Sequence, residues 1–193
     1  VENSAASGEL KYQALFLHAE ALARQDKHHE AARRLQTLER KWRRSHLYPE
    51  VLYRLVTTDL KQGRLSNVCA RARKLYSKYP AHPRVLAWGN RLNEVEIDGK
   101  KLPCGASDDD FSKRIKSLQW AGESEKAHRE IVALMERAPE TDKPRLDMIL
   151  ANFLVSVGSV DDALNLLIRY YPQMKANVSF LNLLGRAAAR SGE

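Results

Sequence analysis

Histidine and acidic side chains are the groups with which this chain could do acid–base or metal chemistry. His29 and Glu30 start like a helical zinc motif, but Arg33 holds the position at which a second histidine ligand is needed. The six histidines never fall three or four residues apart along the sequence. We therefore expect no metal site in this chain.

Motifs for nucleotide or covalent chemistry are also missing. The sequence has no Gly-x-x-x-x-Gly-Lys phosphate loop, no Gly-x-Gly-x-x-Gly, no Gly-x-Ser-x-Gly and no Ser-x-x-Lys. The acidic run Asp108 to Asp110 precedes an apolar helical pattern, and its carboxylates suit the start of a helix. We expect no catalytic residue and no cofactor, while the question of catalysis stays open for a longer parent protein.

Two cysteines leave two alternatives. Cys69 lies within a helical pattern, and Cys104 lies in a stretch that contains Gly, Pro and Ser. The two pair if that stretch folds back over the helix; otherwise Cys69 packs as a small apolar residue. For the same reason, the sequence does not decide between an oxidising and a reducing compartment.

Charge is distributed unevenly along the chain. Residues 1–101 contain 20 Lys and Arg against 11 Asp and Glu, whereas residues 102–193 contain 12 against 13. The excess of +8 therefore belongs to the first half, which predicts attraction to polyanions such as nucleic acid or a cell-wall polymer. Most of these cations fall on second helices of the expected hairpins, so a solvated outer face is the alternative.

The elements that must position any site are helices, and one helix pair is repeated almost unchanged. The repeat length is 36 residues, the distance from Gly122 to Gly158 and from Ala127 to Ala163. Each glycine lies between two runs of apolar residues that are spaced three and four positions apart, as on one face of a helix. A glycine allows the chain to reverse between two helices. Such a hairpin buries its apolar face only by stacking on neighbours.

Similar hairpins are predicted in the first half, at Leu10 to Ser45 and at Tyr48 to Pro80. Asp26 takes the place of the turn glycine in the first of them, which Asp tolerates. We expect a further helix from His82-Pro83 to Val95. The predicted organisation is residues 1–96 as basic repeats plus an extra helix, 97–107 as a linker, and 108–193 as further repeats of which the last is truncated. No apolar run approaches the roughly 18 to 20 residues that span a bilayer.

This pattern resembles the tetratricopeptide repeat (TPR), whose closest match is the stretch from Leu181 through Gly185 and Ala187 to Gly192. The resemblance implies an all-α fold, a right-handed superhelix of helix hairpins (an α-solenoid) of about four and a half repeats with an irregular insertion. It also implies a non-catalytic scaffold for protein–protein interaction, with a protein or peptide in the concave groove. A variant of this groove grips a terminal carboxylate; Asn152 fits one of its positions, but Met148 stands where its lysine is expected.

The stretch from Cys104 onward is also similar to the helical superhelix of soluble lytic transglycosylases, in Arg114, the turn at Gly122, Lys126-Ala127 and Glu130-Ile131. Those are bacterial periplasmic enzymes that cleave peptidoglycan, and the glutamate motif of their catalytic domain is absent here. This resemblance implies a non-catalytic segment in the periplasm or cell envelope, which it favours over the cytoplasm, with peptidoglycan as an anionic polymer for the basic half. An RNA-binding helical repeat is a further alternative, although no recurring pair of base-reading side chains is present.

Helix register indicates which side chains face the groove of the scaffold. The candidate partner-binding residues lie on the first helix of each hairpin: Phe16, Glu20, Tyr53, Thr57, Lys61, Lys116, Gln119, Trp120, Asn152 and Arg186.

Overall fold

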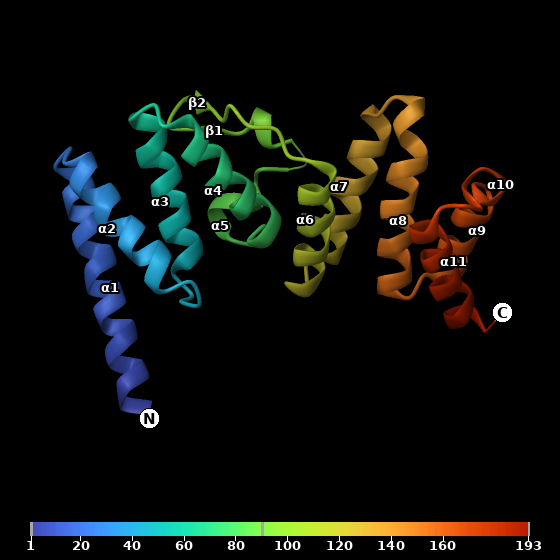
Figure 1. Ribbon diagram of the computed structural model, residues 1–193, viewed down its shortest axis with the longest axis horizontal. Helices are drawn as coiled ribbons and strands as arrows, with labels where there is room; N and C mark the ends of the chain where they lie inside the picture. The colour runs from blue at the N-terminus through green and yellow to red at the C-terminus, as the bar shows by residue number, and fades with distance from the viewer. Residues whose placement is uncertain (1, 90, 193) are drawn as a thin grey trace. The chain divides into compact units, whose positions relative to one another are not determined.

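The chain is almost entirely helical, as predicted. The computed structural model describes residues 2–89 and 91–192, and the side chains of residues 2–7 are not part of that description. These residues form eleven α-helices, two 3-10 turns and one short β-hairpin (Figure 1). Within each unit, consecutive helices pack against one another, as α1 does with α2 and α8 does with α9, so the fold is compatible with a helical repeat.

Two compact units divide the chain, the first ending at Asp110 and the second starting at Phe111. The first unit contains α1 (Glu2–Arg24), α2 (His28–Lys41), α3 (Tyr48–Lys61), α4 (Leu65–Lys78), α5 (Pro83–Leu86), η1 (Leu92–Glu94), β1 (Glu96–Ile97) and β2 (Lys100–Lys101). The second contains most of α6 (Asp108–Trp120), then α7 (Ser124–Arg137), η2 (Glu140–Asp142), α8 (Lys143–Val157), α9 (Val160–Ile168), α10 (Tyr171–Met174) and α11 (Val178–Ser191).

The four turns that join α1 to α2, α3 to α4, α6 to α7 and α8 to α9 have one geometry. Each has a residue with positive φ: Asp26 at 58°, Gly63 at 70°, Gly122 at 83° and Gly158 at 90°. The next residue donates its N–H to the carbonyl five positions earlier, as Lys27 does to Leu22 and Ser159 does to Leu154. This is the Schellman motif that ends a helix in the left-handed conformation. Asp26 therefore occupies the expected turn position.

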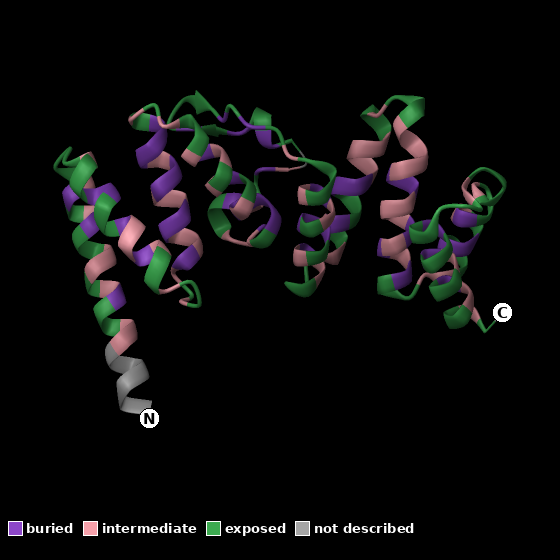
Figure 2. Cartoon of the chain, viewed as in Figure 1, coloured by how far each residue is buried: buried purple, intermediate pink, exposed green. Residues whose placement is uncertain are grey.

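Apolar residues at helical spacing form the core of each unit (Figure 2). In the first unit the cluster joins α1, α2 and α3 through Tyr12, Ala19, Leu35, Leu38, Val51 and Leu55. In the second unit it joins α8, α9 and α11 through Ala151, Val155, Ala163, Leu164, Leu167, Phe180, Leu183 and Ala187. The residues at the expected helix crossings, Ala31, Val68, Ala127 and Ala163, are all fully buried.

The segment after α4 differs from the prediction of one further helix reaching Val95. Helix α5 ends at Leu86, and Gly89 then takes a positive φ of 61°. Downstream, β1 and β2 pair antiparallel around Asp98-Gly99, whose φ angles of 51° and 72° are those of a tight hairpin turn. The Asp-Gly pair was the local signal for this hairpin, and the sequence interpretation overlooked it.

Enlarging the buried crossing residues tests this packing. We expect Ala127→Leu and Ala163→Leu each to lower the free energy of unfolding by about 1–3 kcal/mol, because three extra carbons cannot fit without moving a helix. Urea denaturation followed by circular dichroism measures the change. Ala189→Leu, at an exposed position on α11, is the matched control. Unchanged stability in both crossing variants would contradict the packing.

None of the helices within residues 2–89 and 91–192 has the length and apolar character that a membrane span requires.

Candidate functional site

The first helices of the hairpins in unit 1 are joined by a chain of ion pairs. The Arg54 guanidinium on α3 lies 2.8 Å from a carboxylate oxygen of Glu20 on α1 and 3.2 Å from one of Glu50. Glu50 also accepts from Arg84 of α5 at 3.1 Å. The Glu20 and Glu50 side chains are only 16% and 18% exposed, so water screens these pairs incompletely. We call the surface formed by α1, α3 and α5 the first-helix face of unit 1.

A cleft of about 410 Å³ opens on this face. Four of the predicted partner-binding residues line it: Glu20, Tyr53, Thr57 and Lys61. Its other lining residues are Ala23, Arg24, Asp26, His28, Leu35, Arg54, Thr58, Arg84 and Asp98. Helical register alone therefore predicted four side chains that the fold brings into one cleft, although they are up to 41 residues apart in the sequence.

A second cleft of about 520 Å³ shares Tyr53 and Arg84 with the first. The Arg84 guanidinium carbon lies 4.9 Å from the centroid of the Tyr53 ring, a cation–π contact. The second cleft continues past this pair along Trp88, Arg91 and Glu96. The two clefts are therefore neighbours that meet at Tyr53 and Arg84, and we refer to them together as the groove of unit 1.

The charges along the groove are of two kinds. Arg54 and Arg84 are neutralised by carboxylates, whereas Arg24 and Lys61 have no polar partner among the described residues. Beside the groove, burial lowers the pKa of His82, although Glu50 opposes that shift, so His82 is uncharged at neutral pH. The groove therefore offers hydroxyl groups, an aromatic face and two available cations.

Phe16 does not line the cleft. It is half-buried and packs against the core cluster that contains Leu35 and Leu38. Conversely, Arg54, Arg84 and Asp98 line the cleft, but helical register did not select them as partner-binding residues. The spacing of Glu50 and Arg54 is that of a helical i, i+4 ion pair, which was a usable signal. Asp98 had no such signal, because its place in the lining depends on the hairpin.

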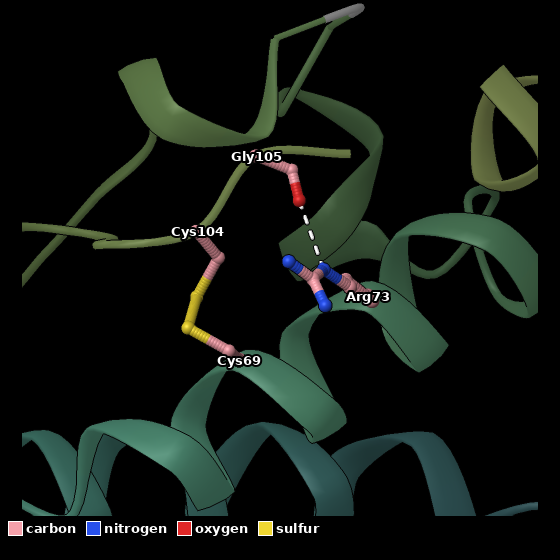
Figure 3. The surroundings of a disulfide bond; sticks show 4 residues. All are labelled: Cys69, Arg73, Cys104 and Gly105. Carbon is pink, nitrogen blue, oxygen red and sulfur yellow. Dashed lines mark hydrogen bonds between the residues drawn. A yellow bond between two sulfur atoms is a disulfide. The ribbon is translucent and has the colours of Figure 1, made fainter. Parts of the chain in front are cut away.

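A disulfide between Cys69 of α4 and Cys104 holds the segment that follows the hairpin (Figure 3). The two Cα atoms are 5.4 Å apart, within the range of ordinary disulfides. Nearby, Arg73 donates from Nε to the carbonyl oxygen of Gly105 at 2.9 Å. The sequence had left the pairing of the cysteines open, and the structure shows them bonded. The disulfide thereby stabilises the segment whose hairpin contributes Asp98 to the cleft.

The first helices of unit 2, α6, α8 and α11, are also joined by polar contacts. Gln119 donates to the Ser156 hydroxyl, and Arg186 donates to the Asn152 side-chain oxygen at 2.8 Å. Three of the predicted partner-binding residues therefore lie in bridges between adjacent helices. The remaining two, Lys116 and Trp120, are exposed on α6, and Trp120 has 87% of its surface accessible. We call this surface the first-helix face of unit 2.

A cationic surface lies on α2 and the turn after it. Six of its side chains are exposed and have no carboxylate partner among the described residues: Arg33, Arg34, Arg40, Lys41, Arg43 and Arg44. By contrast, Arg71 of α4 is bonded to Glu39 and to the fully buried Asp59. Six cations of the first half are thus available on α2 and the turn that follows it.

The described residues contain no group of three or more His, Cys, Asp and Glu side chains that could hold a metal ion. The two first-helix faces offer hydrogen bonds, ionic contacts and apolar contact.

Comparison with models of known protein families and with curated proteins found no match to this chain.

Proposed function

We propose that the chain is a non-catalytic TPR-like scaffold, in which superhelical stacking of the hairpins presents the first-helix faces to a protein or peptide partner. The observation that supports this most directly is the cleft of unit 1. Four side chains chosen from helix register for a partner-binding role line that one cleft. Recognition grooves of this sort are concave, largely preformed, and carry a few well-placed polar groups.

The walls of the groove suit a bound peptide better than a reaction. The ion pairs of Glu20, Arg54, Glu50 and Arg84 hold α1, α3 and α5 in fixed positions, so little ordering is needed when a partner binds. The Tyr53 ring offers apolar area, and Thr57 and Lys61 offer polar contacts to a peptide backbone or side chain.

Panning a random peptide library against the immobilised chain tests this proposal. We expect enriched peptides whose affinity falls about tenfold in the double variant Tyr53→Ala, Lys61→Glu, because an aromatic anchor and a cation are removed together from the cleft. Isothermal titration calorimetry measures the dissociation constants.

Arg33→Glu is the control for that experiment, since it makes the same charge change on the exposed side of α2. A library that yields no binder, or binders that are insensitive to the cleft variant and to changes on the face of unit 2, would contradict a peptide scaffold.

A second candidate is a non-catalytic superhelical segment of a periplasmic lytic transglycosylase. Two observations favour it: the six available cations on and after α2, which suit an anionic polymer, and the Cys69–Cys104 disulfide, which suits an oxidising compartment such as the periplasm. Under this proposal the chain co-sediments with purified peptidoglycan, Arg33→Glu weakens retention, and a rise in salt weakens it further. Tighter binding to RNA than to peptidoglycan would instead favour an RNA-binding helical repeat, whereas equal binding to both would indicate attraction by charge alone.

A further inference from the structure

The arginines on the first-helix faces of the two units are held in different ways. In unit 1, Arg54 pairs with Glu20 and Arg84 pairs with Glu50. In unit 2, Arg186 donates to the amide oxygen of Asn152 at 2.8 Å, and Arg190 donates to the backbone carbonyl of Val155 at 2.7 Å. A neutral acceptor orients a guanidinium group but leaves its positive charge uncompensated.

Carboxylates are nearly absent from the first helices of unit 2. From Phe111 on, α6, α8 and α11 contain seven Lys and Arg but one carboxylate, Asp147. That carboxylate is only 8% exposed and accepts from the Tyr170 hydroxyl, a hydrogen bond that is the main cause of the Tyr170 pKa rising to about 12. The acidic side chains of this unit belong mostly to the second helices and the turns. Carboxylates outside the first helices pair with Arg114, Lys143 and Arg145, and the cations that have no such partner make the face positive although residues 102–193 sum to −1.

Three of these cations are exposed and have no carboxylate partner among the described residues: Lys116, Arg186 and Arg190. Two apolar side chains lie on the same helices. Trp120 is 87% exposed and Val157 is 43% exposed, and each directly follows a member of the hydrogen-bonded pair Gln119 and Ser156. Exposed tryptophan beside arginine is the composition of a binding hot spot.

The cations and Trp120 lie at two adjacent levels. The bond between Gln119 and Ser156 marks one level along α6 and α8, and Trp120 directly follows Gln119 at that level. The bond between Asn152 and Arg186 marks a level one helical turn away, about 5.4 Å. Side chains two residues apart on an extended peptide point the same way and are separated by roughly 6.6 Å. An extended peptide therefore reaches both levels with an acidic residue and an apolar residue two positions apart.

We propose that the first-helix face of unit 2 binds an extended peptide segment in which an acidic side chain pairs with Arg186 and Lys116, and an apolar side chain two residues away covers Trp120. This inference rests on the proposed scaffold function and names the chemistry of its partner. A single exposed indole and three exposed cations favour a short acidic peptide over a nucleic acid, which needs a longer run of phosphate contacts and repeated stacking.

The test uses the full chain and peptides enriched from the random library, synthesised with amidated C-termini so that all negative charge comes from side chains. We expect one enriched class to carry Asp or Glu two positions from an aromatic or aliphatic residue. For that class, Trp120→Ala is expected to raise the dissociation constant about tenfold, and Arg186→Gln about three- to fivefold. Replacing the peptide's acidic residue with its amide should reproduce the loss seen in Arg186→Gln, and the two changes together should add little more.

Matched controls separate this surface from the rest of the molecule. Arg129→Gln makes the same change on exposed α7, and Tyr53→Ala removes the aromatic anchor of unit 1; neither should affect the acidic class. Enriched peptides without the acidic pattern, or acidic peptides insensitive to Trp120→Ala and Arg186→Gln, would overturn this inference while leaving the scaffold function in place. Tighter binding of single-stranded RNA than of the acidic peptides, with loss in the same variants, would also overturn it. A library that yields no binder at all contradicts both.

Discussion

Replacing Arg114 with a methionine side chain is expected to lower the free energy of unfolding of unit 2 by about 3–5 kcal/mol. Arg114 is completely buried between α6 and α7, and its guanidinium makes two bonds with Glu130, from Nε at 2.7 Å and from Nη2 at 2.8 Å. The variant Arg114→Met removes the guanidinium and leaves the Glu130 carboxylate, only 8% exposed, without its cation. The midpoint and slope of urea denaturation measure the loss.

The double variant Arg114→Met, Glu130→Met is the control, because it removes both charges and keeps apolar volume in the same place. We expect it to recover most of the loss, since a well-packed apolar pair is often as stable as the buried ion pair it replaces. If Arg114→Met were as stable as the unchanged protein, the buried pair would not exist in solution. If the double variant were less stable than the single one, the stability would come from packing by each side chain separately.

Removing the disulfide is expected to have an effect of similar size, now confined to unit 1. Cys69 and Cys104 are 35 residues apart, and closing a loop of that length restricts the unfolded chain enough to contribute about 3–4 kcal/mol. Cys69→Ala, Cys104→Ala should therefore lower the urea midpoint of unit 1 and leave that of unit 2 unchanged. Because the bonded segment follows the hairpin that places Asp98 in the cleft, peptide binding at the cleft should weaken as well.

A reducing agent provides the matched measurement for this second prediction. It should destabilise the unchanged protein by about as much as the double alanine variant, and it should have no further effect on that variant. A urea midpoint that is the same with and without reductant would show that the two cysteines are not bonded in solution.

Local patterns predicted the helices and most of their turns correctly. The positive φ at Asp26, Gly63, Gly122 and Gly158 could be expected, since a reversal after a helix selects residues that tolerate the left-handed region. The complete burial of Ala127 also followed from apolar spacing within single helices. The position of Tyr53 in a cleft followed from the same helical register.

Contacts between distant residues were predicted less well. The hairpin at Asp98-Gly99 lies at the start of the segment that we expected to be a linker, and the pairing of Cys69 with Cys104 was one of two open alternatives. Arg114 was noticed only as a basic residue before an apolar run, and its burial against Glu130 was not expected. Each of these features depends on which side chains the fold brings into contact, and local sequence patterns do not predict such contacts.

The sequence by itself therefore determined the all-helical character, the hairpin turns and which residues share one side of each first helix. These depend on interactions within about four residues, which a helix repeats every turn. Only the tertiary structure decided that Arg54 is neutralised by Glu20 whereas Arg186 is held by the neutral Asn152. Both contacts join residues 34 positions apart, so they form only when successive hairpins pack in register. That packing sets Arg54 against a carboxylate, which compensates its charge, and Arg186 against an amide oxygen, which does not.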